Sequence, residues 1–125
     1  GTPDANRYET IPSVIYTTPE VAFVGMTEEQ AKAAGIRCQV VKAPMMLSGR
    51  YVCENGRGNG FCKIVYDIDR QVLLGVHIIG SYASELICAA AIMLQQQLPL
   101  EALKRIVFPH PTVSEIYREA FSLLN

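Results

Sequence analysis

The sequence predicts an α+β fold for a single domain of 125 residues, in which an antiparallel sheet is backed by helices. Two runs rich in β-branched and aromatic residues, Phe61–Tyr66 and Val72–Ile79, are joined by a short segment with two aspartates, which favours a hairpin turn. A long stretch of helix formers follows at Tyr82–Gln97. Shorter segments on both sides give the order strands, helix, strands, helices, which is typical of a layered domain.

The first part of the chain is predicted to be a linker followed by two short strands. Residues 1–10 are polar and turn-prone and are interpreted as a linker or an expression remnant, so the domain is predicted over residues 11–125. Ser13–Tyr16 and Val21–Val24 are β-rich runs separated by a turn around Pro19. We therefore expect two short strands or edge segments here.

A short helix and a third strand are expected next. Thr27 and Gln30 have the spacing of a capping box, in which the threonine hydroxyl and the glutamine side chain satisfy each other's free backbone amides. This helix is expected to end at Gly35. The alternating pattern of Cys38–Lys42 then predicts a strand. The stretch 44–60 contains a proline and several glycines, which indicate an irregular loop.

The C-terminal part is predicted to be helical. The helix over Tyr82–Gln97 has no polar face in its middle, so we expect it to be covered on more than one side. A further helix is expected from Pro99 to Val107, because the residue before Pro109 is pushed out of the helical region. A last helix is expected over Val113–Leu123.

Composition excludes several classes of partner. The net charge is -1, from 11 basic and 12 acidic residues without a run of like charge, so nucleic acid and anionic membranes are not expected to bind. No segment approaches the ~20 apolar residues that span a bilayer, and the polar start has no signal-peptide core. We expect a cytoplasmic protein.

The cysteines have neither Cys-x-x-Cys nor zinc-ligand spacing and are interpreted as reduced structural thiols: Cys38, Cys53, Cys62 and Cys88.

Most cofactor and metal signatures are missing. The glycine-rich segment Gly56–Gly60 lacks the Gly-x-Gly-x-x-Gly spacing and does not open a helix, so we predict no cofactor-binding residue in this chain. Asp67 and Asp69 are interpreted as ordinary turn residues rather than cation ligands. No metal site is predicted.

The two histidines differ in their surroundings. His77 belongs to an otherwise apolar strand, where a hydrogen-bonded structural histidine is the favoured interpretation. His110 lies between Pro109 and Pro111, which restrict the backbone and are expected to direct its imidazole outward.

Glu115 follows His110 after five positions, and an imidazole paired with a carboxylate is what general-base chemistry near neutral pH requires. A competing interpretation uses the same residue for structure. Thr112 and Glu115 also have the spacing of a helix capping box, and spacing alone favours this cap over catalysis.

The segment Phe108–Glu115 resembles the histidine-proline-threonine signature that closes the flavin-dependent disulfide oxidoreductases, above all the dihydrolipoamide dehydrogenases. Ile15–Ala31 is similar to the opening of the interface domain of that family. Leu74–Gly80 with Ala83–Ile87 resembles its central hairpin and helix. The resemblance covers nearly all of Ile11–Leu124 and implies the fold of an FAD/NAD-linked reductase dimerisation domain.

In this family the complete subunit binds FAD in one domain and NAD in another and carries a redox-active cysteine pair. The resemblance therefore implies that this chain is a fragment of a larger flavoenzyme, binding neither cofactor and having no turnover alone. It also implies a homodimer, in which His110 is the acid–base residue for the dithiol and Glu115 orients it. His110 and Pro111 would then lie near the flavin of the partner subunit, and the peptide bond between these two residues would be cis.

Three functions stay open at this point. The lipoamide type implies dihydrolipoamide oxidation with NAD reduction and a 2-oxo acid dehydrogenase complex as a further partner. Glutathione reductases have a similar ending, whereas the Thr18–Ala22 opening favours the lipoamide type. Lipoamide enzymes often carry a second histidine where Phe108 stands here. A free-standing dimerisation module without catalysis is the third alternative. Under each of the three alternatives, the stretch Leu86–Leu94, which is apolar on all sides, predicts a symmetric dimer.

Overall fold

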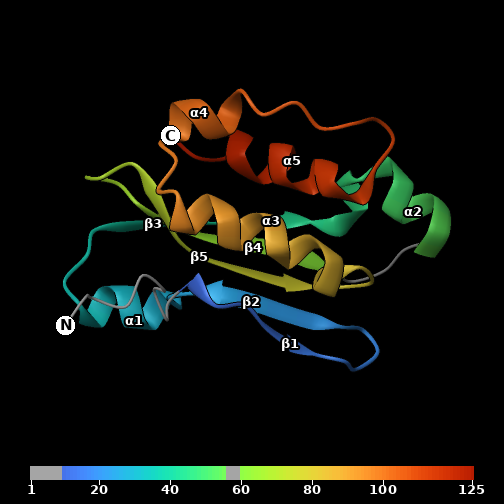
Figure 1. The fold of residues 1–125 in the computed structure, drawn as a ribbon, viewed down its shortest axis with the longest axis horizontal. Coiled ribbons are helices and arrows are strands. Elements are labelled where there is room, and N and C mark those ends of the chain that lie inside the picture. Colours follow the sequence, from blue (N-terminus) through green and yellow to red (C-terminus); the bar gives the residue numbers. More distant parts are fainter. Residues whose placement is uncertain (1–9, 56–59) are drawn as a thin grey trace, which may run out of the picture.

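The computed structural model describes residues 10–55 and 60–125, without the side chains of residues 53–55. Its centre is a five-stranded antiparallel sheet with the strand order β1-β2-β5-β4-β3 (Figure 1). The strands are β1 (Ser13–Ile15), β2 (Val21–Gly25), β3 (Cys38–Pro44), β4 (Phe61–Asp67) and β5 (Val72–Ile79). The predicted α+β class is confirmed, and residues 1–9 of the predicted linker over residues 1–10 lie outside the described residues.

The predicted hairpin forms the middle of the sheet. Strands β4 and β5 pair from Phe61 opposite Ile79 to Asp67 opposite Val72. The carboxylate of Asp67 accepts hydrogen bonds from the backbone amides of Asp69 and Arg70, each at 3.0 Å. Asp67 is therefore a turn residue, as its short side chain predicts.

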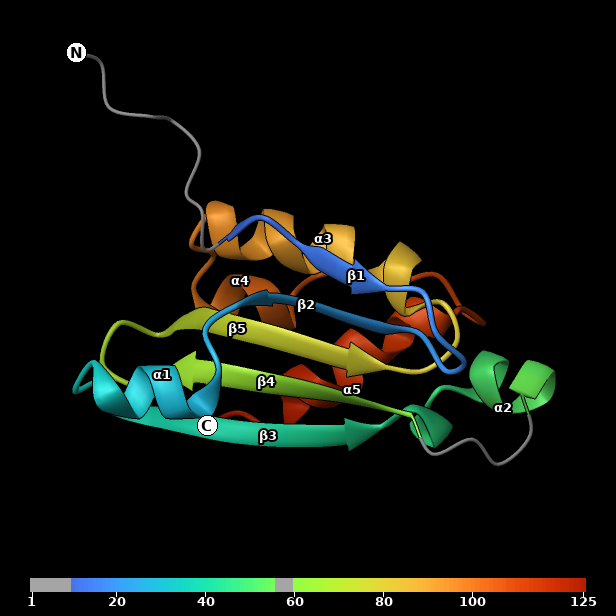
Figure 2. The same ribbon diagram turned by 90° about the horizontal axis from the view of Figure 1, so that it is seen from below.

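The helices lie mainly on one face of the sheet, where α3 packs over β2 and β5 and α5 packs over β3 and β4 (Figure 2). The helices are α1 (Glu28–Ala33), α2 (Gly49–Asn55), α3 (Ala83–Gln95), α4 (Leu100–Lys104) and α5 (Ile116–Ser122), with 3₁₀ turns η2 (Met45–Leu47) and η3 (Val113–Glu115). The predicted capping box of α1 is present, with both the Thr27 and Gln30 side chains bonded to backbone amides.

The stretch 44–60 is not the irregular loop that its glycines and proline predict. Instead, η2 and α2 occupy residues 45–55, while the glycine-rich residues 56–59 lie outside the described part of the chain. Met45 is fully buried and attaches η2 to the core. The tyrosine of α2, Tyr51, is also buried, so tertiary packing rather than local propensity holds this short helix in place.

The two C-terminal helices are shorter than predicted. Helix α4 ends at Lys104 instead of Val107, because the amides of Arg105 and Ile106 bond three residues back and tighten the last turn. Ile106 then packs against the core outside the helix. The last helical segment begins as the 3₁₀ turn η3 and becomes α-helical only at Ile116.

Helix α3 is covered on the side of the sheet and of α5, but its outer side is open in the single chain. Leu86, Ile87 and Leu94 are buried, whereas Ile92 is 54% exposed and Cys88 is exposed. The predicted cover on more than one side is thus incomplete within one copy of the domain.

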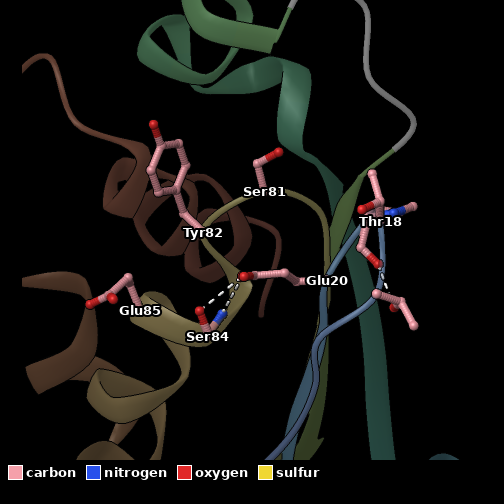
Figure 3. Close-up of a pocket in the computed structure, with 8 residues that line it drawn as sticks. Thr18, Glu20, Ser81, Tyr82, Ser84 and Glu85 are labelled. Carbon is pink, nitrogen blue, oxygen red and sulfur yellow. Dashed lines mark hydrogen bonds between the residues drawn. The ribbon is translucent and has the colours of Figure 1, made fainter.

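A carboxylate from the connection between β1 and β2 caps the start of α3. The N-cap residue Tyr82 has a φ of 72° and makes no side-chain capping bond. Instead, one oxygen of Glu20 accepts hydrogen bonds from the amide of Ser84 at 3.1 Å and from its hydroxyl at 2.9 Å (Figure 3). The negative charge also suits the positive end of the helix dipole.

Replacing Glu20 with alanine should therefore lower the free energy of unfolding by about 1–2 kcal/mol, the usual effect of losing an N-cap. Urea denaturation of the 125-residue chain measures this loss. Glu85→Ala is the matched control, because Glu85 is an exposed acid in the first turn of the same helix. Equal losses in both variants would show that Glu20 acts through charge alone.

Candidate functional site

The segment that carries His110 connects α4 to η3 and is restrained by its own threonine. The hydroxyl of Thr112 donates a hydrogen bond to the carbonyl of Pro109 at 2.7 Å and so spans His110 and Pro111. The His110–Pro111 peptide bond is cis, as the resemblance implies. These features present His110 at the surface.

His110 and Glu115 form a pair with very different exposure. The Nδ1 atom of His110 lies 2.8 Å from Oε1 of Glu115. The imidazole side chain is 77% exposed, whereas the carboxylate side chain is only 5% exposed. The structure therefore brings together the two residues that the sequence singles out, with the carboxylate fixed in the protein and the imidazole directed outward.

The contact defines the tautomer of the neutral imidazole. An ionised carboxylate only accepts hydrogen bonds, so Nδ1 carries the hydrogen and donates it to Glu115. The lone pair of the neutral ring then resides on Nε2. This arrangement suits a general base, because the carboxylate also stabilises the imidazolium that forms when Nε2 takes a proton.

The alternative capping box at Thr112 and Glu115 is wrong. Thr112 occupies the N-cap position of η3, but its side chain makes no capping bond. Its hydroxyl is already used by the carbonyl of Pro109 and by the hydroxyl of Ser114 at 3.0 Å. Glu115 is thereby free of a capping role at Thr112 and directs one oxygen to His110.

Arg118 adds a positive charge on the other side of the carboxylate. Its Nη2 atom lies 4.0 Å from Oε2 of Glu115, one turn along the helix. A buried carboxylate is stabilised by such a counter-charge. The sequence analysis missed Arg118, although the i,i+3 spacing from Glu115 predicts this contact once the helix is assigned.

His77 has the surroundings of a structural histidine, as predicted. Its Nε2 atom lies 3.1 Å from the carbonyl of Met26, and its ring stacks on Phe23 with a centroid distance of 6.0 Å. Both contacts connect neighbouring parts of the sheet.

The cysteines give no redox pair within the described side chains, where Cys38, Cys62 and Cys88 are free. Burial raises the pKa of the Cys62 thiol to about 12, so this thiol stays protonated near neutral pH. Among the residues that the structure describes, no cluster of three or more His, Cys, Asp or Glu residues could hold a metal ion. The described helices are all too short or too polar to cross a membrane.

Two of the recesses in the described part of the structure are lined in part by Tyr82 at the start of α3. One, of about 470 Å³, is lined by the β1–β2 connection and the start of α3, and Glu20 is already bonded there (Figure 3). The other, of about 230 Å³, is lined by Arg50, Tyr82 and residues 111–113. The second recess therefore adjoins the segment that presents His110.

Comparison with known proteins identifies the same domain throughout. Residues 11–121 match the family model described as the pyridine nucleotide-disulphide oxidoreductase dimerisation domain. Mitochondrial dihydrolipoyl dehydrogenase of Caenorhabditis elegans is 41% identical over 120 residues, which cover 96% of this chain and 24% of the relative. Leghemoglobin reductase of Vigna unguiculata is 44% identical over 113 residues, which cover 90% of this chain and 21% of the relative.

The solved structures agree with this match. The HOCl-induced flavoprotein disulfide reductase RclA from Escherichia coli superposes with a TM-score of 0.89 at 30% identity, over 98% of this chain and 27% of that protein. The chain thus spans about a quarter of the length of the relatives that it matches. It belongs to the dimerisation-domain family of the pyridine nucleotide-disulphide oxidoreductases.

Proposed function

We propose that residues 11–125 are the dimerisation domain of a larger, dihydrolipoamide dehydrogenase-like flavoprotein, with residues 1–10 as a linker to its other domains. In this proposal the protein is a homodimer, and His110 of one subunit is the acid–base residue of the dithiol site of the other. The observation that carries the proposal is the exposed imidazole of His110 held by the buried carboxylate of Glu115.

The whole enzyme is proposed to oxidise dihydrolipoamide with NAD as the final acceptor and FAD as its flavin. The names of the relatives support this class, since they include dihydrolipoyl dehydrogenases and a flavoprotein disulfide reductase. A 2-oxo acid dehydrogenase complex is the proposed further partner. A glutathione-reductase-like enzyme would use the same His110 and Glu115 pair on a different disulfide.

Among the described residues, the start of α3 does not suit the phosphates of FAD or NAD. The start of α3 is the natural place for a pyrophosphate, since a helix N-terminus attracts anions. Here the carboxylate of Glu20 already occupies that position, and it would repel a phosphate group. We therefore propose that both cofactors are bound by the parts of the enzyme beyond this domain.

The proposed chemistry of the chain is one proton transfer. A substrate thiol has an ordinary pKa of about 8.5, so little of it is thiolate at neutral pH. Nε2 of His110 accepts the thiol proton, which leaves a thiolate and an imidazolium. The buried carboxylate of Glu115 stabilises the imidazolium through Nδ1 and preserves the orientation of the ring. The proton later returns to solvent from the same nitrogen.

Hybrid dimers test whether His110 acts across the subunit interface. One full-length subunit carries His110→Gln, and the other carries serine in place of its redox-active cysteine pair. Donation across the interface leaves one intact site per hybrid, so we expect about half of the parent dithiol turnover. If His110 acted within its own subunit, the hybrid would not recover activity above the two inactive homodimers. If His110 had no catalytic role, the His110→Gln homodimer would itself be active.

A further inference from the structure

Ser48 is a fully buried polar residue in the stretch where the sequence predicts only a loop. Three polar or charged residues are buried in the described part of the chain: Ser48 at 0%, Asp67 at 4% and Glu115 at 4% relative exposure. Asp67 closes the central hairpin and Glu115 binds His110. Ser48 lies between η2 and α2, so its burial needs a separate explanation.

The hydroxyl of Ser48 makes two hydrogen bonds. It accepts one from the amide of Tyr51 at 3.4 Å, which has the geometry of a cap for α2. It donates the other to the carbonyl of Thr112 at 3.1 Å, across 64 positions of sequence. The second bond is not needed to cap a helix and joins η2 and α2 to the segment that presents His110.

Thr112 is the central fixed point of that segment. Its hydroxyl bonds back to Pro109 before the histidine, and its carbonyl accepts the amide of Glu115 after the histidine at a long 3.4 Å. Among the described residues, two groups donate hydrogen bonds to the Thr112 carbonyl: the Ser48 hydroxyl and the Glu115 amide. Without the Ser48 hydroxyl, the long bond from the Glu115 amide would remain. Fixing Thr112 therefore restrains both ends of the path between His110 and Glu115.

We infer that Ser48 is a positioning residue for His110, which holds the His110–Glu115 pair in place through the carbonyl of Thr112. The catalytic part of this inference rests on the proposed function of His110, whereas the restraint on the segment does not. The donor of this hydrogen bond is fully buried, so the Ser48 hydroxyl is fixed by its surroundings and holds the Thr112 carbonyl in a defined position.

The experiment compares Ser48→Ala with Thr27→Ala in the full-length flavoenzyme. Both substitutions remove a hydroxyl that caps a helix, but the Thr27 hydroxyl caps α1 and bonds only the amide of Gln30 among the described contacts. For Ser48→Ala we expect the kcat of dithiol oxidation to fall about tenfold at nearly constant KM, less than the ~10²-fold effect of a 1 Å misplacement. NADH-dependent dye reduction should stay at the parent rate in both variants, and dithiol turnover should stay at the parent rate in Thr27→Ala.

Hydrogen–deuterium exchange provides a readout that does not depend on catalysis. Amides in residues 110–116 should exchange faster in Ser48→Ala and at the parent rate in Thr27→Ala. Ser48→Thr, which retains a hydroxyl, should restore slow exchange and dithiol turnover. If Ser48→Ala fails to retain flavin, Ser48→Gly serves instead, because glycine is nearly as good an N-cap as serine.

The inference is wrong if Ser48→Ala, or its glycine substitute, changes exchange only in α2 and leaves the ratio of dithiol to dye turnover unchanged. That result would reduce Ser48 to a helix cap. If the amides of residues 110–116 exchanged at the parent rate in Ser48→Ala, Ser48 would not restrain this segment. If His110→Gln were fully active while Ser48→Ala still released residues 110–116, the proposed function would fail but the restraint would stand.

Discussion

Replacing His110 with glutamine should slow dithiol-dependent NAD reduction by at least ~10²-fold in the full-length flavoenzyme, within the ~10²–10⁴-fold range for loss of a general base. Glutamine is similar in size and can still hydrogen-bond to Glu115, but its amide does not accept a proton near neutral pH. Steady-state turnover with dihydrolipoamide measures the effect. Flavin content and dimerisation should persist, because the His110 side chain is 77% exposed in this domain and contributes little to its core.

Electron transfer from NADH to an artificial dye is the control for this substitution, since it bypasses deprotonation of the dithiol. It should proceed at the parent rate in His110→Gln. Glu115→Gln should reduce dithiol turnover less, because the base remains and only its orientation and charge stabilisation suffer. Dithiol turnover of His110→Gln within about threefold of the parent would contradict the catalytic role, since general-base loss is far larger.

The central hairpin and α3 could be predicted from the sequence because their signals are local. Runs rich in β-branched and aromatic residues indicate β4 and β5, and Asp67 closes the turn with its own neighbours. The helix α2 gives no comparable signal, since it is short and depends on the burial of Met45 and on contacts of Ser48 with distant Thr112. Such tertiary contacts override local propensity and are not visible in a single sequence.

The candidate site was predictable as a set of residues but not as a geometry. The prolines around His110 and the distance to Glu115 indicate a paired imidazole and carboxylate. The spacing from Thr112 to Glu115 fits a capping box, and spacing alone favours that cap over catalysis. The choice is made in three dimensions, where the Thr112 hydroxyl bonds to Pro109 instead.

Tyr117→Ala should cause the largest loss of stability, about 3–5 kcal/mol in the free energy of unfolding, as for other large aromatic residues removed from cores. Tyr117 is fully buried two residues after Glu115. Its ring stacks on Phe121 and lies near Phe108, with centroid distances of 6.0 Å and 6.1 Å. Its hydroxyl donates to the carbonyl of Leu86 in α3. Burial raises the pKa of this hydroxyl well above its usual value, so it stays a donor.

Urea denaturation of the 125-residue chain measures this loss, and two further variants separate its causes. Tyr117→Phe retains the ring and should lose only about 1 kcal/mol, the contribution of one hydrogen bond. Phe23→Ala removes a similar ring from the half-buried outer face of the sheet, where it stacks on His77, and should lose about 1–2 kcal/mol. Because native domains are stable by only ~5–15 kcal/mol, the Tyr117→Ala loss would remove a large part of the total. If Tyr117→Ala lost no more than Phe23→Ala, the aromatic contacts of Tyr117 would not be what fixes α5, and with it Glu115, against the rest of the domain.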